Sequence, residues 1–421
     1  MASHLNPGRR LVISLMGTGN GAHVIAGLAG ANPNYEVRLL TRRPEIFKSR
    51  QITVQRPGKM GGEDVTGTVD VVGTDPAEVL PGSDVVLWCG PVSATPAAFR
   101  TIAPTLEAMK NEEGRSAYVG TLFAQGCTHL LAKSILGDDT PYFALQNIPW
   151  LCTTIEPGRV ARIVGNKHHI RVATSSNTSF TWTKKFLEPC INASTGFKGA
   201  ELQNIPDFAS IVLNPANQII HPARMWGRFS DWDMETPFEP GTLGSLYGDF
   251  DEKSAEALVG LDEELQSIKS ALLTACPELD LTSVIPLADR IVQQYGDQVA
   301  DKTNMQTIMS TNQAYSMAQF PVVEVEGGVI PNNNHRVVLD DIPHGLIPLK
   351  DLALRLSLPS PWMDSMILWH QKFMKKSYMT VNGDLSGSDI GECTSVTVLG
   401  GEEIANVGFT NPPVTPTSNL I

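Results

Sequence analysis

The chain has 421 residues, of which 42% are hydrophobic and 18% are charged, which is the composition of a globular protein with room for two domains. The formal net charge is −12 without a run of Lys or Arg, which argues against nucleic acid as a partner. The six cysteines form no CxxC pair and no metal-ligand spacing, so we expect reduced thiols and no metal site. No apolar run approaches the roughly 18 residues of a membrane span, and the N-terminus lacks the apolar core of a signal peptide. We therefore expect a soluble cytoplasmic protein without a membrane partner.

A glycine-rich segment at residues 17–23 (GTGNGAH) directly follows an apolar run at 11–16. The run predicts a β-strand, and residues 22–28 predict a helix. In α/β proteins such a loop holds the pyrophosphate of a dinucleotide, because glycines allow a tight turn and a close approach of the backbone to the phosphate. The alternative is a simple turn without a ligand. We assign the cofactor site to the loop residues Gly17, Gly19, Asn20, Gly21 and Ala22.

Strand-like and helix-like segments alternate through the first half of the chain. Strands are predicted at 35–40, 52–54, 66–72, 84–88, 117–119 and 142–145, and helices at 96–109 and 128–136. Residues 159–164 and 170–174 are predicted to form an antiparallel pair. The alternation predicts an α/β N-terminal Rossmann domain, a doubly wound parallel sheet, over residues 1–200, with its ligand crevice at the carboxyl ends of the strands.

The pattern changes beyond residue 200. Apolar residues recur at three-and-four spacing over 251–276, 283–295, 349–356 and 362–378, and strand-like alternation is nearly absent. We therefore predict an all-α C-terminal domain over residues 201–400. Residues 401–421 include a Pro- and Thr-rich stretch from Asn411 with little to bury, which predicts a disordered tail.

The end of the second predicted strand indicates which nicotinamide cofactor the loop binds. In NAD-binding proteins an Asp or Glu about 20 residues after the loop pairs with the ribose 2′-hydroxyl. Here the position holds Thr41, followed by Arg42 and Arg43, and we assign all three to the cofactor site. Because guanidinium groups suit a 2′-phosphate, the sequence favours NADP(H), with NAD(H) as the alternative. One or both arginines could instead be solvated loop residues.

The segment 214–228 carries the first candidate catalytic residue, His221. Asn214 and Pro215 predict a helix start, since Asn caps a helix and Pro needs no N–H donor there. Pro222 is expected to kink this helix or to mark the start of a second one. A buried structural histidine is the alternative to a catalytic one. The polar residues of the segment share one face of the predicted helix: Asn217, His221, Arg224 and Arg228.

A second cluster follows the turn-rich residues 327–334. Arg336 stands five residues before Asp341, a pair able to bind a substrate carboxylate and to support a histidine. The alternative is that Asp340 or Asp341 caps a helix that begins near Pro343.

Short motifs along nearly the whole chain, in this order and spacing, resemble the opine dehydrogenases, the octopine and nopaline dehydrogenase group. The motifs are Gly17-x-Gly19-Asn20-Gly21-Ala22-His23, Gln125-Gly126, Pro149-Trp150, His221-Pro222 with Gly227-Arg228 and Trp232-Asp233, Thr311-Asn312 with Tyr315, Gly327-Gly328, and Arg336 with Asp341-Ile342-Pro343. The resemblance implies a Rossmann domain followed by an all-helical domain, similar to the glycerol-3-phosphate and 6-phosphogluconate dehydrogenases. This agrees with the domain boundary predicted from periodicity.

The resemblance also implies a reaction. The amino group of an amino acid and the carbonyl of a 2-oxo acid, such as pyruvate, form an imine, which NAD(P)H reduces to a secondary amine with two carboxylates. His221 matches the catalytic histidine of the family and Asp341 its acidic partner. Arg336 matches the arginine that holds a substrate carboxylate, and Gln125 aligns near the oxo-acid site. Because His221 and the cofactor lie in different domains, we expect domain closure to exclude water that would hydrolyse the imine.

Two features depart from the family pattern. His344 lies close to Asp341 in the sequence and could compete with His221 for it, and the pair Arg42-Arg43 is not typical of the NADH-using members. No motif identifies the amino-acid pocket. Two other functions stay open: a single-substrate reductase of the ketopantoate or glycerol-3-phosphate type, and a non-catalytic dinucleotide-sensing protein.

Overall fold

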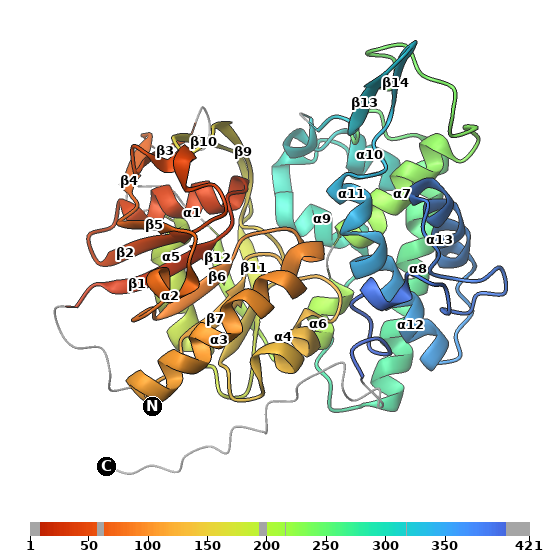
Figure 1. The fold of residues 1–421 in the computed structure, drawn as a ribbon. Helices are drawn as coiled ribbons and strands as arrows, with labels where there is room; N and C mark the ends of the chain where they lie inside the picture. Colours follow the sequence, from red (N-terminus) through yellow and green to blue (C-terminus); the bar gives the residue numbers. More distant parts are fainter. Residues whose placement is uncertain (1–8, 57–62, 193–199, 215, 317, 401–421) are drawn as a thin grey trace.

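The computed structural model describes residues 9–56, 63–192, 200–214, 216–316 and 318–400. A unit built on β-sheets, formed by the first half of the chain, lies beside a helical unit formed by the second half (Figure 1). The chain passes from one to the other after β12 (Glu201–Ile205), an edge strand of the large sheet. The tail predicted to be disordered, 401–421, lies outside the described residues.

The large sheet has eight strands in the order β12-β11-β8-β7-β6-β1-β2-β5. From β5 to β8 the neighbouring strands are parallel, whereas β11 is antiparallel to β8. The strand order reverses at β1, between β2 and β6, and doubly wound sheets bind their ligands at such a point. The predicted doubly wound sheet is thus confirmed. Besides β12, its strands are β1 (Leu11–Met16), β2 (Tyr35–Leu40), β5 (Val71–Gly73), β6 (Val85–Trp88), β7 (Tyr118–Thr121), β8 (Tyr142–Leu145) and β11 (His169–Thr174).

Helices bury both faces of the large sheet. Ile13 and Leu15 of β1 pack with α1 (Asn20–Gly30) and α5 (Phe180–Asn192) on one face. Val86 of β6 packs on the other face with α3 (Thr95–Glu113), α4 (Thr128–Leu136) and α6 (Phe208–Leu213), and α2 (Pro76–Val79) adjoins α3. Because successive side chains of a strand point to opposite faces, a strand covered on both sides is apolar throughout, as β6 is.

A second sheet packs against α1. Its four strands follow the order β4-β3-β10-β9 and are β3 (Gln51–Gln55), β4 (Val65–Thr68), β9 (Trp150–Glu156) and β10 (Val160–Asn166). The contact between α1 and β4 is close, since a Cβ on Gly67 would lie 2.1 Å from the carbonyl oxygen of Gly27. This sheet therefore holds α1, and with it the glycine loop, from the side opposite the large sheet.

Two predicted strand assignments in this region are wrong. The segment 66–72 is not one strand, because β4 ends at Thr68 in the second sheet and β5 begins at Val71 in the large one. The segments 159–164 and 170–174 do not pair with each other: β10 pairs with β9 and β3, and β11 pairs with β8 and β12. Period-two alternation identifies a strand but not its partner, and β9 is absent from the predicted elements.

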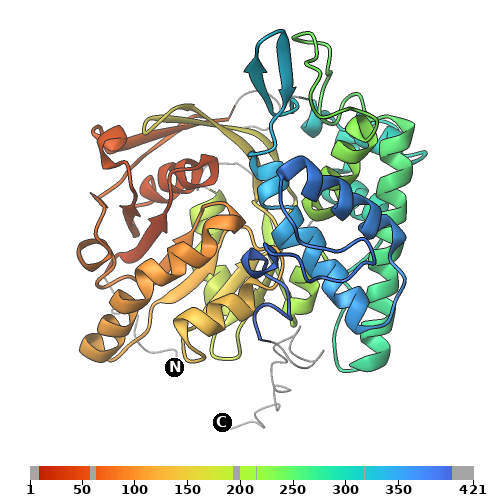
Figure 2. The ribbon, with the colours of Figure 1, turned by 45° about the vertical axis from the view of Figure 1, so that its right-hand side comes forward.

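The helical unit packs around the long helix α8 (Glu252–Ala275). The last described segment of this unit reaches back to the sheet unit (Figure 2). There Cys127 N donates to the carbonyl oxygen of Thr394 (3.0 Å). The hairpin of β13 (Val322–Val325) and β14 (Gly328–Pro331) projects from it (Figure 1). The other helices are α7 (Asn217–Phe229), α9 (Leu287–Tyr295), α10 (Met305–Ser310), α11 (Arg336–Leu339), α12 (Ile347–Arg355) and α13 (Pro361–Met374), and short 3-10 turns lie at Pro44–Phe47, Val92–Ala94, Gly296–Gln298, Gln313–Tyr315 and Ile390–Glu392.

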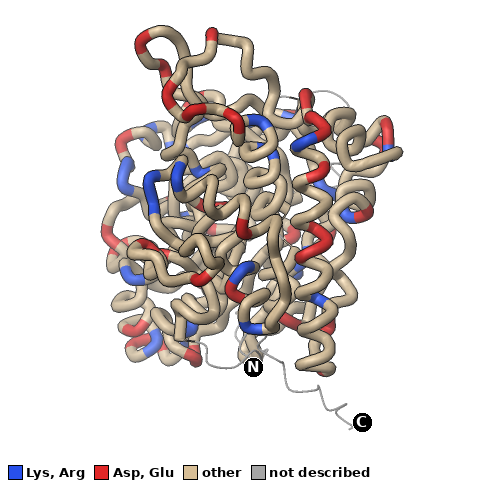
Figure 3. Tube along the Cα trace, turned by 90° about the vertical axis from the view of Figure 1, so that its right-hand side faces the viewer, with Lys and Arg blue, Asp and Glu red and all other residues tan. Residues whose placement is uncertain are grey.

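The surface of the projecting region is acidic. The β13–β14 hairpin and residues 229–250 beside it contain Asp and Glu but no Lys or Arg, and they show red on tan at the top of Figure 3. Within the described part of the chain, no helix has both the length and the apolar character that crossing a membrane requires.

Candidate active site

The glycine loop lies at the carboxyl end of β1, beside the segment that follows β6. Gly17 has a φ of +105°, which L side chains rarely adopt, and a Cβ there would lie 3.5 Å from the backbone nitrogen of Gly90. Gly19 stands before the first turn of α1, whose N–H groups have no partner within the helix and can bind an anion. A Cβ on Gly21 would lie 2.7 Å from Cδ2 of Leu122, so this position must also stay small. The loop therefore fits a dinucleotide pyrophosphate.

Asn20 and His23 tie the start of α1 to the β9–β10 hairpin. Oδ1 of Asn20 accepts a hydrogen bond from Thr154 N (2.9 Å), and Nε2 of His23 accepts one from Gly158 N (2.8 Å). Burial lowers the pKa of His23, which fits a neutral ring with its proton on Nδ1. Ala22 between them is buried. The Asn20 side chain thus serves the fold, and its backbone N–H is what it offers to a cofactor.

Thr41, Arg42 and Arg43 follow β2, at the same edge of the sheet as the glycine loop. Thr41 is buried, and its Oγ1 accepts a hydrogen bond from Arg43 N (3.0 Å). Both arginines are exposed, and neither guanidinium forms an ion pair with a described residue. The two charges are therefore available to an anionic group at this edge.

His221 and Asp341 form a buried hydrogen-bonded pair in the helical unit. Nδ1 of His221 lies 2.5 Å from Oδ2 of Asp341, and the two side chains are 7% and 4% exposed. Because a carboxylate accepts at Nδ1, this nitrogen carries the proton of the neutral ring and Nε2 is the acceptor. His221 lies on α7, which continues through Pro222 as one helix. The predicted helix start at Asn214 is wrong: this residue ends α6, where its Oδ1 accepts from the Arg290 guanidinium.

Tyr247 faces the other ring nitrogen of His221. Its hydroxyl oxygen lies 2.5 Å from Nε2, and the two rings stack with centroids 5.9 Å apart. Burial, reinforced by the charge of Asp341, raises the pKa of Tyr247, so the phenol keeps its proton and donates it to Nε2. Sequence reasoning missed Tyr247, because it stands in a segment without periodicity. The sequence feature that could have identified Tyr247 is a tyrosine, with its hydroxyl group, among the closely spaced glycines of 241–248.

Arg224 holds the loop that carries Tyr247. It is buried, its Nε donates to the carbonyl oxygen of Leu246 (2.7 Å), and its Nη1 pairs with Oδ2 of Asp251 (2.5 Å). Arg228, on the same predicted face, is exposed. The polar face of α7 therefore does not act as one unit: His221 faces the site, whereas Arg224 supports it from within the fold.

Asp340 and Asp341 precede η6 (Ile342–Leu346), a π-helical turn, and such turns are frequent at functional sites. Neither carboxylate caps a helix, so the capping interpretation is wrong. Asp341 faces His221 instead, and Oδ1 of Asp340 accepts a hydrogen bond from Ser93 N of the sheet unit (2.9 Å).

Gln125 connects the sheet unit to this pair. Its Nε2 donates to Oδ1 of Asp341 (2.8 Å) and to the carbonyl oxygen of Asp340 (3.1 Å). Its Oε1 is buried and has no hydrogen-bond partner among the described residues. The next residue, Gly126, has a φ of +60°, and a Cβ there would lie 2.6 Å from the carbonyl oxygen of His344. Only glycine allows the two units to approach this closely.

Arg336 begins α11 and is exposed, without an ion pair to any residue in the described ranges. Its charge acts on Tyr247 of the helical unit and on Cys152 of the sheet unit, so it lies near the boundary between them. Arg336 is therefore close to the His221 site and available to an anion.

His344 does not compete with His221 for Asp341. Its Nδ1 lies 3.3 Å from Oγ1 of Thr394, and burial lowers the pKa of His344 to about 4. His344 is therefore neutral near pH 7 and directed to another partner.

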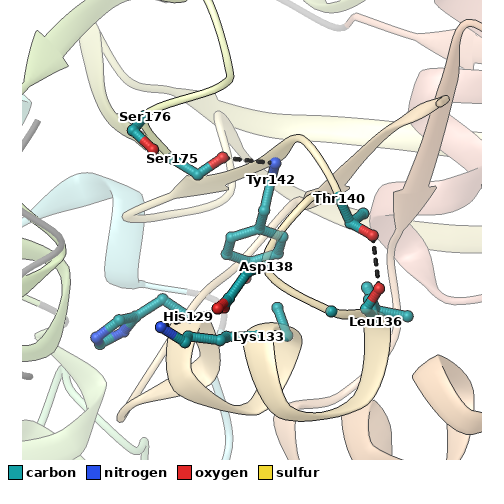
Figure 4. A pocket seen from close by; sticks show the side chains of 10 residues that line it. His129, Lys133, Leu136, Asp138, Thr140, Tyr142, Ser175 and Ser176 are labelled. Atoms are coloured by element: carbon teal, nitrogen blue, oxygen red, sulfur yellow. Dashed lines mark hydrogen bonds and ion pairs between the residues drawn. The ribbon is translucent and has the colours of Figure 1, made fainter. Parts of the chain in front are cut away.

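A cavity of about 250 Å³ lies elsewhere, at the start of β8 (Figure 4). Lys133 pairs there with Asp138 (3.1 Å), and Oγ of Ser175 accepts a hydrogen bond from Tyr142 N (2.9 Å). The start of β8 is at the amino edge of the parallel strands, opposite the glycine loop, and no predicted site residue lines this cavity. We therefore do not assign it to the reaction.

Comparison with known proteins finds relatives that span nearly the whole chain. The opine dehydrogenase of Haliotis discus hannai is 29% identical over 400 residues, which cover 91% of this chain and 95% of that one. A structure of octopine dehydrogenase with NADH and L-arginine has a TM-score of 0.81 and 25% identity, over 95% of this chain and 98% of that one. A structure of octopine dehydrogenase with NADH and pyruvate has a TM-score of 0.78 and 25% identity, over 93% and 95%.

The sheet topology, the glycine loop and these likenesses define an NAD(P)-dependent oxidoreductase with a helical second unit. The family model described as NAD/NADP octopine/nopaline dehydrogenase, alpha-helical domain, matches residues 204–374, which include His221, Arg336 and Asp341. The chain is similar to the opine dehydrogenases over nearly its whole length, and its helical part matches the model of that family. The resemblance of the sequence motifs to this family is thus confirmed.

Proposed function

We propose that this protein catalyses the NAD(P)H-dependent reductive condensation of a 2-oxo acid with the amino group of an amino acid. The carbonyl and the amine lose one water to form an imine, and the imine carbon takes a hydride while its nitrogen takes a proton. The products are a secondary amine with two carboxylates and NAD(P)+. The observation that carries the proposal is the buried His221–Asp341 pair beside the boundary with the sheet unit. Octopine dehydrogenase, which this chain resembles, binds NADH, L-arginine and pyruvate, and this supports both substrate classes.

His221 is the acid–base group in this proposal. Nε2 exchanges the proton that condensation and reduction require, because an imidazole nitrogen can both accept and donate a proton. Asp341 fixes the tautomer and stabilises the imidazolium that forms. Tyr247 lies at Nε2 and is a weak acid there, so we propose that the substrate displaces its hydroxyl and does not take a proton from it.

Arg336 and Gln125 position the substrates. The exposed Arg336 guanidinium can bind a carboxylate at two points and thereby orient the imine carbon. Gln125 lies against Asp341 with a buried Oε1 that lacks a partner among the described residues, so this oxygen can accept a hydrogen bond near the oxo-acid group.

The bound nicotinamide supplies the hydride. The loop residues from Gly17 to Ala22 hold the pyrophosphate, and Thr41 shapes the turn that presents the two arginines. Arg42 and Arg43 favour NADP(H) over NAD(H), because guanidinium groups bind a 2′-phosphate well. In this proposal residues 1–200 form the cofactor domain, whose large sheet β12 completes, and 201–400 form the catalytic domain, and closure of the two excludes water from the imine.

We also propose a cytoplasmic location. All six cysteines are free in the structure, and unpaired thiols are typical of a reducing compartment.

The test measures oxidation of NADPH and NADH with a panel of 2-oxo acids, each with and without an amino acid. The proposal predicts that oxidation requires both substrates and that NADPH is preferred. Oxidation with an oxo acid alone, without response to any amine, would identify a single-substrate reductase instead. Tight cofactor binding without turnover, unchanged in His221→Ala, would identify a dinucleotide-sensing protein.

A further inference from the structure

Two arginines, one buried and one half-buried, lie near each other at the boundary between the units. Arg290 on α9 is 3% exposed; its Nη1 donates to the carbonyl oxygen and Oδ1 of Asn214, but its Nε has no hydrogen-bond partner among the described residues. Arg171 on β11 is half-buried, and its Nη1 is likewise buried without a partner in the described ranges. Neither guanidinium lies within 4.0 Å of a carboxylate of the described chain.

The two charges oppose each other. Burial, with a smaller contribution from the charge of Arg171, lowers the pKa of Arg290 to about 10, against the attraction of Asp262. Asp262 attracts Arg290 more strongly than Arg171 repels it, but it forms no ion pair with Arg290, and its Oδ2 accepts from Leu287 N (2.8 Å) and its Oδ1 from Gln266 Nε2 (3.3 Å). Buried charges normally have a partner, since an unpaired one costs several kcal/mol. Two like charges whose unused N–H donors are buried are therefore suited to an anion.

The arginine pair lies on the same edge of the large sheet as the cofactor loop. Gln146, which directly follows β8, donates its backbone N–H to the carbonyl oxygen of Arg171 (3.0 Å). Its side-chain Nε2 donates to the carbonyl oxygen of Asn214 (3.1 Å), the residue that Arg290 also contacts. This edge is where a doubly wound sheet binds its ligands.

The pair is also close to His221. The charge of Arg290 acts on Tyr315, whose ring centroid lies 4.7 Å from that of Tyr247. Tyr247 in turn contacts Nε2 of His221. Tyr315 and Tyr247 thus connect the surroundings of Arg290 to the acid–base group, which places the arginine pair close to the proposed reaction site.

We propose that Arg171 and Arg290 form a subsite for a further anionic group of a substrate, beyond the two carboxylates that every 2-oxo acid and amino acid bring. The inference rests on the proposed function and adds the substrate class: an amino acid or an oxo acid that ends in a second carboxylate or a comparable anion. The planar guanidinium groups bind this end with charge-assisted hydrogen bonds.

The kinetic test uses the full chain with NADPH and compares matched pairs of substrates. Glutamate is compared with glutamine at fixed pyruvate, and 2-oxoglutarate with 2-oxobutyrate at fixed alanine. In one of the two arms the anionic member is expected to have a kcat/KM about 10- to 100-fold higher, and that arm identifies which substrate carries the anion. Arg171→Gln removes the preference, Arg171→Lys restores part of it, and Arg162→Gln on β10 is the control. Neutral and anionic members that react equally well, with no effect of Arg171→Gln, would overturn the subsite while leaving the proposed function intact.

The subsite can also be tested without enzyme turnover, by measuring how ligands shift the Tm. Glutarate should raise the Tm of the wild-type protein more than the neutral glutaramide does, because a ligand that binds the folded state stabilises it. The difference should be lost in Arg171→Gln and also in Arg290→Met if that variant folds. Equal shifts with glutarate and glutaramide in the wild-type protein would contradict an anion subsite, whatever reaction the enzyme catalyses.

Discussion

Gln125 Nε2 lies 2.8 Å from Oδ1 of Asp341, so a side chain of the sheet unit holds the carboxylate that pairs with His221. Both carboxylate oxygens of Asp341 therefore accept a hydrogen bond, Oδ1 from Gln125 of the sheet unit and Oδ2 from His221 of the helical unit. The acid–base pair depends on the docking of the two units and not only on the fold of the helical one.

Substitution of Gln125 tests this connection. Gln125→Glu places a second carboxylate against Asp341, and two carboxylates this close do not both ionise, so we expect kcat/KM to fall by about 100-fold or more. Gln125→Met removes the Nε2 donor and the Oε1 acceptor without adding a charge, and should cost about 10-fold. Steady-state measurement of kcat/KM for the wild-type protein and both variants tests this, and circular dichroism spectra check that the variants fold. Equal, small effects of the two variants would mean that the bond does not support the pair.

Asp341→Asn keeps the size of the side chain and removes its charge. Without the carboxylate the imidazole loses its fixed tautomer, and we expect kcat to fall by about 10²- to 10⁴-fold, as in other His–Asp pairs. The matched control is Asp340→Asn, because Asp340 faces Ser93 and not His221. Fluorescence titration should give an unchanged affinity for NADPH. A kcat of Asp341→Asn within threefold of wild type would rule out the proposed role.

Arg42 and Arg43 should set the cofactor preference. Each is exposed and without an ion pair to a described residue, so its replacement by Ala leaves the fold unchanged. Loss of charge-assisted contacts to the 2′-phosphate should raise the KM for NADPH by about 10- to 100-fold and leave that for NADH nearly unchanged. Arg100→Ala on α3 is the control. A parallel rise of both KM values would show that the arginines do not read the 2′-phosphate.

Stability should fall as the pH drops below neutrality. Burial lowers the pKa of both His344 and His370 to about 4, whereas the unfolded chain takes up protons near pH 6.5. The unfolded state binds more protons in this window, so each histidine lowers the free energy of unfolding by up to about 1.4 kcal/mol per pH unit between about pH 6.5 and 4. Urea unfolding from pH 7 to 5 measures the slope. His370→Met should reduce it and the exposed His168→Gln should not; an unchanged slope in His370→Met would refute this origin.

The sequence correctly predicted those segments whose local residue pattern is compatible with only one type of secondary structure. The apolar run and glycines at 11–23 became β1, the loop and α1, and the helical periods beyond residue 250 became α8, α9, α12 and α13. Strand partners were predicted less well, because alternation carries no information on pairing, as β10 and β11 show.

Local sequence patterns could not predict contacts between residues that are far apart in the chain. His221 and Asp341 are 120 residues apart, and only the family resemblance brought them together before the structure did. Tyr247 and the pair of Arg171 and Arg290 belong to no motif. Their neighbours come from distant segments, so only the folded chain identifies them.

The most direct measurement of the central claim is the position of a transferred deuterium. The protein is incubated with pyruvate, an amino acid and NADPH deuterated at the reactive C4 position, and the products are analysed by mass spectrometry and NMR. We predict a secondary amine that carries the deuterium on the carbon between the nitrogen and the carboxylate derived from pyruvate. Deuterium found only in lactate, with the amino acid unchanged, would contradict the reduction of an imine.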